Sequence, residues 1–129
     1  MQSQSITPPR NKVDTFESPD FYNLDDLFTA EHKLVRSAVR DFVKREITPI
    51  AEEYAQRAEF PQHLVRKFGQ IGVFGATIPT EYGGGGLDQI SYGLMTQEIE
   101  RGDSGMRSCV SVQNSLVMYP ILTFGSEKQ

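Results

Sequence analysis

Polar side chains near the C-terminal end of the chain have the residue types and spacing to bind an anion. Arg107, Ser111, Asn114 and Ser115 recur at helical spacing, with Ser108 beside them, so they form one narrow stripe on a helix. The chain carries no charged residue from position 108 to position 126, so this helix lacks an ordinary solvent-exposed face and should lie inside a domain. Its opposite side carries Met106, Cys109, Val110 and Val117. A stripe of hydroxyls and amides headed by an arginine is therefore interpreted as one wall of a ligand site.

The position of Arg107 also favours an anionic ligand. Asp103 or Ser104 can cap a new helix after the break at residues 102–105, which places Arg107 in the first turn. A cation there opposes the helix dipole at a cost of about 0.3–1 kcal/mol, unless a bound anion interacts with both. The alternative is a structural salt bridge from Arg107 to Glu100 or Asp103, with the serines of the stripe bonded back to helix carbonyls.

No catalytic apparatus is visible elsewhere in the sequence. Glu98 and Glu100 are two residues apart and point to different helix faces, so they do not form an acid–base couple. The glycine run at residues 83–86 has neither the Gly-x-Gly-x-x-Gly pattern nor a following Gly-Lys-Ser/Thr, and it is interpreted as a flexible turn. One cysteine excludes an internal disulfide, and His32 and His63, both expected at the surface, form no metal-ligand cluster. We therefore predict no catalytic residue and no metal site in this chain.

Helices upstream must position the stripe, and the first is predicted to begin after Thr29 as its cap. Its charged residues are expected on a solvated face. Its apolar positions are Leu34, Val35, Ala38, Val39, Phe42 and Val43. Pro49 either kinks this helix or starts a second one behind Thr48 as cap. Before the first helix, the apolar residues around Asn23 are expected either to begin a short helix after Asn23 or to pack on the domain surface.

Two more helices are expected before the stripe. Pro61 suits the first position of one, and Gly72 suits its left-handed end. Its core side is Leu64, Val65, Phe68 and Ile71. Asp88 is the predicted cap of the other, which should end near Asp103. It turns Tyr92, Met95 and Ile99 inward.

Composition limits the class of protein. The 129 residues suffice for one domain, and 38% hydrophobic residues allow a modest core. A net charge of −4 argues against a nucleic-acid or anionic-membrane surface, and the polar interruptions of the stripe helix argue against a membrane span. The acidic N-terminus, without an apolar stretch, argues against a secretory signal or transit peptide. We expect residues 1–28 to form a partly flexible arm before a domain at residues 29–129.

The most specific part of the sequence is its last quarter. Residues 98–129 read EIERGDSGMRSCVSVQNSLVMYPILTFGSEKQ. This pattern resembles glutaryl-CoA dehydrogenases, a branch of the FAD-dependent acyl-CoA dehydrogenases, and a looser resemblance extends back to about Thr29. In that branch, an arginine and the serine four residues later contact the distal carboxylate of the substrate. The resemblance implies these roles for Arg107 and Ser111, with Ser108 also lining the site and Glu100 as the ionic neighbour of Arg107.

The resemblance also implies a fold and an activity. The fold would be all-α, the truncated N-terminal helical domain of an acyl-CoA dehydrogenase, incomplete where a helix starts at residues 126–129. The full enzyme would bind FAD mainly through regions outside this segment. A glutamate beyond residue 129 would remove the α-proton while the β-hydride passes to the flavin, and decarboxylation would give crotonyl-CoA. This segment alone would form one wall of the acyl pocket and be inactive.

Partners and location follow from the same resemblance. The full-length protein is expected to be a homotetramer that binds acyl-CoA and passes electrons to an electron-transfer flavoprotein. It would work in the cytoplasm of a bacterium or in the mitochondrial matrix. Three alternatives remain: a short-chain acyl-CoA dehydrogenase in which Arg107 is structural, a related binding or scaffold domain without chemistry, and a helical interaction module.

Overall fold

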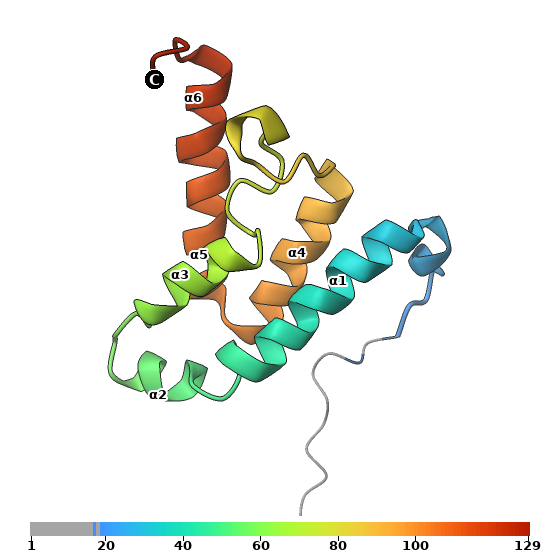
Figure 1. Cartoon of the computed structure of the whole chain (residues 1–129). Helices are drawn as coiled ribbons and strands as arrows, with labels where there is room; N and C mark the ends of the chain where they lie inside the picture. Colours follow the sequence, from blue (N-terminus) through green and yellow to red (C-terminus); the bar gives the residue numbers. More distant parts are fainter. Residues whose placement is uncertain (1–16, 18) are drawn as a thin grey trace, which may run out of the picture.

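Helices account for all the regular structure in the described part of the chain. The computed structural model describes residue 17 and residues 19–129 (Figure 1). Its elements are the 3-10 helix η1 (Leu24–Leu27), α1 (Ala30–Phe42), the π-helix η2 (Val43–Ile47), α2 (Ala51–Gln56), α3 (His63–Gln70), the 3-10 helix η3 (Thr80–Tyr82), α4 (Gln89–Gly102), α5 (Ser104–Ser111), the π-helix η4 (Val112–Met118) and α6 (Tyr119–Phe124). The all-α prediction is confirmed. The arm predicted to be flexible lies largely outside the described residues.

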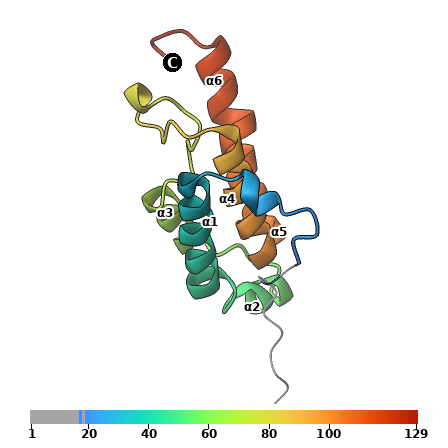
Figure 2. The same ribbon diagram turned by 90° about the vertical axis from the view of Figure 1, so that its right-hand side faces the viewer.

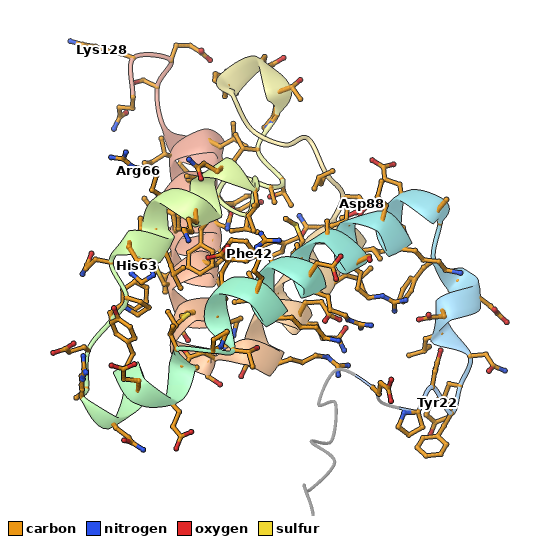
Figure 3. All side chains as sticks on the ribbon, turned by 60° about the horizontal axis from the view of Figure 1, so that its bottom comes forward. Tyr22, Phe42, His63, Arg66, Asp88 and Lys128 are labelled. Atoms are coloured by element: carbon orange, nitrogen blue, oxygen red, sulfur yellow. The ribbon has the colours of Figure 1, made fainter. Side chains whose placement is uncertain are left out.

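The helices pack around one core, and α1 lies along α4 in both ribbon views (Figures 1 and 2). α5, η4 and α6 follow one another without a break and form one long helix, with α3 beside its first part (Figure 1). The core residues are Val39, Phe42, Val43, Ile47, Leu64, Phe68, Val73, Ala76, Met95, Ile99, Met106 and Val110. Phe42 lies near the centre of the view in Figure 3, with its ring centroid 5.8 Å from that of Phe68. Each of the larger apolar side chains in this core contributes about 1.5–3 kcal/mol on burial.

α1 buries a narrower face than the sequence predicts. Val39 and Phe42 are buried and Val35 is half-buried, whereas Leu34 is 70% exposed and Ala38 is also exposed. The reason is that, among the described residues, α1 packs mainly on α4, and one neighbouring helix covers only one stripe of its surface. The short helix expected after Asn23 is confirmed as η1.

The chain around Pro49 follows neither of the predicted alternatives. α1 continues directly into the π-helical turn η2, which buries Val43 and Ile47 completely. Thr48 does not cap a helix, because its backbone N–H bonds to the carbonyl of Val43 (2.9 Å) and α2 starts after Ile50 without a side-chain cap. η2 packs against the end of α4, and this contact sets the path of the chain between α1 and α2.

α3 agrees with its prediction in part. Leu64 and Phe68 are buried and Gly72 has the left-handed φ of 74° that ends the segment, as expected. Pro61 is not the first helical residue, since α3 begins two residues later. Val65 is 39% exposed and does not belong to the core.

His32 is a buried residue, which corrects its expected place at the surface. It is 7% exposed and joins the N-termini of two helices. The Thr29 hydroxyl accepts from the His32 backbone N–H (3.1 Å), and the Thr29 N–H donates to His32 Nδ1 (3.3 Å). Because Nδ1 accepts, the ring proton sits on Nε2, which donates to Asp88 Oδ2 at 2.7 Å. Asp88 also caps α4 as predicted, accepting from the Ser91 N–H (2.8 Å).

Because of this arrangement, part of the free energy of unfolding depends on pH in the acid range. The Ser91 backbone N–H and then His32 lower the pKa of Asp88 from 3.8 to about 2. The folded state therefore binds this proton more weakly than the unfolded chain, so the stabilisation is complete above pH 3.8 and is lost as the pH falls through about 2. Asp88→Asn keeps a capping oxygen but cannot titrate. We expect the difference in unfolding free energy between wild type and Asp88→Asn to shrink across this pH window in urea titrations. A constant difference would contradict the prediction.

The glycine run is a packed turn. The backbone N–H groups of residues 83–86 bond to the carbonyls of Thr80, Pro79, Gly75 and Ile78, respectively, at 2.9–3.1 Å. The prediction of a turn between buried segments is confirmed, because Ala76 and Ile78 are buried and α4 follows. Its expected flexibility is wrong, because all four amides of the run are hydrogen-bonded. The run lies directly on the preceding loop, and a Cβ built on Gly84 would lie 2.1 Å from the carbonyl oxygen of Ile78.

Alanine substitutions at two glycines should have opposite effects. Gly84→Ala is expected to lower the free energy of unfolding by about 1–3 kcal/mol, because the Ile78 backbone must move. Gly93→Ala is the matched control, since it lies on an exposed face of α4 with nothing within 4 Å of the added Cβ. It should raise the free energy of unfolding by about 0.5–1 kcal/mol. Urea denaturation of both variants tests this, and equal effects would contradict it.

Candidate functional site

The junction between α4 and α5 determines where the predicted site residues lie. α4 ends at Gly102, and Asp103 has extended backbone angles and accepts a hydrogen bond from the Met106 N–H at 2.7 Å. Asp103 is therefore the N-cap of α5, one of the two predicted residues. The cap turns the chain so that the first turn of α5 faces the last turn of α4. This brings Arg107 next to Glu100.

Arg107 is held by two side chains from these helices. Its Nε donates a short hydrogen bond to Glu100 Oε2, and its Nη1 donates to Ser111 Oγ at 3.3 Å. The other Glu100 oxygen accepts from Ser104 Oγ at 2.5 Å. Ser104 first, and then Arg107, lower the pKa of Glu100. Glu100 thus stays ionised beside the guanidinium, and both side chains are about two-fifths exposed (37% for Arg107 and 43% for Glu100).

The structure thus brings together three of the four predicted site residues, Arg107, Ser111 and Glu100, which we call the arginine cluster. The Ser111 hydroxyl accepts from Arg107 and donates to the carbonyl of Ser108 at 3.2 Å. Ser115 bonds back to the Ser111 carbonyl at 2.6 Å. Both serines therefore make the local helix bonds of the structural alternative, and Ser111 contacts the guanidinium as well.

Ser108 is the fourth predicted residue, and its side chain lines a neighbouring hollow of about 810 Å³ between α5 and the start of α3. The lining residues are Phe60, Gln62, Val65, Phe74, Gly105, Ser108, Cys109, Val112 and Gln113. Arg107 and Ser111 are not among them. Cys109 is half-buried there, and burial raises the pKa of its thiol. The site predicted from the sequence therefore divides into an arginine cluster and a mostly apolar hollow next to it.

Asn114 does not belong to an open ligand wall, which corrects its place in the predicted stripe. It is 4% exposed and lies beneath the loop at residues 73–76. Val117, predicted on the buried side, is 39% exposed, whereas Met106 and Val110 are buried as expected. The second half of the long helix is not enclosed by the described residues, since Leu116 is 69% and Phe124 is 83% exposed.

A second ion pair, which the sequence did not predict, joins α1 to α4. Glu98 is fully buried and accepts two hydrogen bonds from Arg40, from Nε and Nη2, each at 2.9 Å. Arg40 was expected on a solvated face of the first helix, and this expectation is wrong. The only sequence signal was that position 98 lies one turn after the inward position Met95 and next to the inward position Ile99. Glu98 and Glu100 have separate partners, which agrees with their predicted positions on different helix faces.

Neither a metal-ligand cluster nor a free set of glycine amides is present among the described residues. No group of three or more His, Cys, Asp and Glu side chains in this part of the chain has the geometry to hold a metal. All four amides of the glycine run bond to backbone carbonyls, so they do not fit the role of a phosphate cradle. Within residues 17 and 19–129, no helix is both long and apolar enough to span a bilayer.

Comparisons with known proteins agree on one family. Residues 29–129 match the family model of the acyl-CoA dehydrogenase N-terminal domain. The 3-(aryl)acrylate reductase of Clostridium sporogenes is 42% identical over 102 residues, 79% of this chain and 27% of that protein. The mitochondrial short-chain specific acyl-CoA dehydrogenase of Rattus norvegicus is 39% identical over 98 residues, 76% of this chain and 24% of that protein.

A solved structure shows the same arrangement of helices. The crystal structure of a glutaryl-CoA dehydrogenase from Mycobacterium smegmatis in complex with FADH2 superposes with a TM-score of 0.80 at 39% identity, over 83% of this chain and 28% of that chain. The chain thus spans about a quarter of the length of the relatives it matches. Since the family model covers residues 29–129, the chain belongs to the acyl-CoA dehydrogenase family.

Proposed function

We propose that this chain is part of an FAD-dependent acyl-CoA dehydrogenase that oxidises glutaryl-CoA and decarboxylates the product to crotonyl-CoA. In this proposal, the arginine cluster binds the distal carboxylate of the acyl chain. The flavin supplies the oxidation when it is bound. Its contacts and the catalytic glutamate are proposed to lie outside the described residues, because the glycine run has no free amides and Glu98 is paired with Arg40.

The arrangement of Arg107 is the observation that carries this proposal. Two of its five N–H groups bond to Glu100 and Ser111, and the others have no partner among the described residues. Glu100 orients the guanidinium from one side, so that the remaining edge can meet a carboxylate with two parallel hydrogen bonds. A bidentate contact of this kind favours a dicarboxylic acyl chain over a plain fatty acyl chain.

The dicarboxylic substrate would reach the free edge of the Arg107 guanidinium from the N-terminal end of the stripe. Beyond Ser111, the loop at residues 73–76 covers Asn114 on the same helix face, so the carboxylate would contact Arg107 and Ser111 only. Ser108 would contact a different part of the substrate, from the apolar hollow. Acyl-CoA, an electron-transfer flavoprotein and three further copies of the chain are the proposed partners, in the bacterial cytoplasm or the mitochondrial matrix.

A second candidate is a short-chain acyl-CoA dehydrogenase in which Arg107 is purely structural. Two observations favour it: the ion pair between Arg107 and Glu100, and the similarity to the short-chain specific enzyme of rat. In that case the cluster would serve only to join α4 to α5.

The experiment that separates the two candidates uses the full-length flavoprotein. We would mix it anaerobically with glutaryl-CoA and, separately, with butyryl-CoA, and follow the bleaching of flavin absorbance. Fast bleaching by glutaryl-CoA alone supports the first candidate, and preference for butyryl-CoA supports the second. A protein that carries no flavin would contradict both.

A further inference from the structure

Asn114 uses its whole hydrogen-bonding capacity inside the protein. Its Oδ1 accepts from the backbone N–H groups of Gly75 (2.7 Å) and Ala76 (3.3 Å). Its Nδ2 donates to the carbonyls of Val73 and Val110, each at 2.8 Å. An asparagine side chain has two donors and two acceptor positions, so every one of them is paired. Three of the four bonds cross from the long helix to the loop at residues 73–76, and this makes Asn114 a link between the two.

The link lies where the long helix changes its winding. α5 ends at Ser111 and the π-helix η4 begins at the next residue, with the Tyr119 N–H bonded to the Asn114 carbonyl five residues earlier. At such a junction the regular pairing of N–H and C=O groups shifts by one residue. Here side chains bond to the carbonyls just before it: Asn114 to Val110 (2.8 Å) and Ser115 to Ser111 (2.6 Å). Asn114 therefore stabilises the junction and sets its place in the helix.

The loop on the other side of the link is itself fixed. The Gly75 carbonyl accepts from Gly85 and the Ala76 carbonyl accepts from Leu87, both at 2.9 Å. The Val73 N–H bonds to the carbonyl of Phe68 at the end of α3 (3.2 Å). The loop is thus held by the glycine run and by α3, and it provides Asn114 with a rigid reference.

We propose that Asn114 is a positioning residue for the carboxylate-binding Arg107. This inference rests on the proposed function. Asn114 lies seven residues after Arg107 and three after Ser111, and residues at this spacing share one helix face. Fixing the rotation of the helix at Asn114 against the loop therefore fixes the direction in which the arginine cluster points. Without the link, the helix would keep its core contacts through Met106 and Val110 but lose the bonds that set its rotation.

The test uses Asn114→Asp in the full-length flavoprotein. Aspartate has the same shape and keeps the acceptors for Gly75 and Ala76, but it cannot donate to Val73 and Val110. A misplacement of a binding group by about 1 Å can cost about 10²-fold in rate. We therefore expect the ratio of kcat/KM for glutaryl-CoA to kcat/KM for butyryl-CoA to fall about tenfold or more. If Asn114→Asp does not give a folded flavoprotein, Asn114→Ser takes its place.

The matched control is Asp88→Ala, which removes the N-cap of α4 at the end away from Glu100. It should lower the melting temperature as well, but leave the substrate ratio unchanged. A lower ratio in the Asn114 variant alone supports the inference. Equal losses on both substrates, with wild-type preference for glutaryl-CoA intact, would overturn the inference and leave the proposed function standing. A wild-type enzyme without that preference would overturn the proposed function and this inference with it.

Discussion

Arg107→Ala is expected to lower kcat/KM for glutaryl-CoA by about 10- to 150-fold and to leave kcat/KM for butyryl-CoA nearly unchanged. The physical reason is the loss of a charge-assisted contact in a partly exposed site, which corresponds to about 1.5–3 kcal/mol. Butyryl-CoA has no distal carboxylate, so it loses nothing directly. Steady-state kinetics of the full-length flavoprotein with both substrates measures this difference.

The control for this prediction is Arg57→Ala. Arg57, directly after α2, also pairs with a glutamate, Glu53, but both side chains are 58% exposed. This variant should leave both substrates unchanged. Equal losses on glutaryl-CoA and butyryl-CoA in Arg107→Ala would instead assign Arg107 a structural role, as in the short-chain candidate. Ser111→Ala should show the same selectivity as Arg107→Ala to a smaller extent, because it removes a neutral partner.

Arg40→Met is expected to lower the free energy of unfolding by about 3–5 kcal/mol. It leaves the Glu98 carboxylate, which is fully buried, without its two hydrogen bonds from Arg40. Arg101 lies nearby, with its Nε 3.8 Å from Glu98, and keeps the expected loss at the lower end of that range. Urea denaturation at neutral pH measures the change.

A double variant distinguishes loss of the pair from loss of packing. Arg40→Met combined with Glu98→Leu removes both charges and should be less destabilised than Arg40→Met alone, since no buried charge remains unpaired. Arg57→Met, at the exposed pair with Glu53, should change stability by less than about 1 kcal/mol. If Arg40→Met has an effect as small as that of Arg57→Met, the buried pair between α1 and α4 contributes no more than a surface pair.

Sequence patterns predicted the structure correctly where the stabilising interaction is local. Thr29 and Asp88 were predicted as helix caps from residue type and position, and Asp103 as one of two candidates. Each of the three accepts the expected backbone hydrogen bond. A cap depends only on residues within one turn, so the sequence contains the whole interaction. The left-handed φ of Gly72 was predicted for the same reason.

Predictions failed where several elements meet. His32 was expected at the surface, and its burial depends on Asp88, which lies 56 residues away. Arg40 was expected in solvent, and its partner Glu98 lies 58 residues away. The pattern of a single helix shows which residues are polar, but it does not show which of them a distant element will cover. The same holds for Leu34, which fits the apolar face of α1 but is not covered by any of the described residues.

The sequence by itself determined the helical fold, the helix caps Thr29 and Asp88, the family and the spacing that places Arg107 and Ser111 on one face. These follow from periodicity, local hydrogen bonding and a long specific motif. Only the tertiary structure decided which members of the stripe remain open. Glu100 and Ser111 hold Arg107 at the surface, whereas the loop at residues 73–76 covers Asn114. The reason is physical: helical spacing fixes directions around one axis, but burial is decided by the chain that packs against that axis.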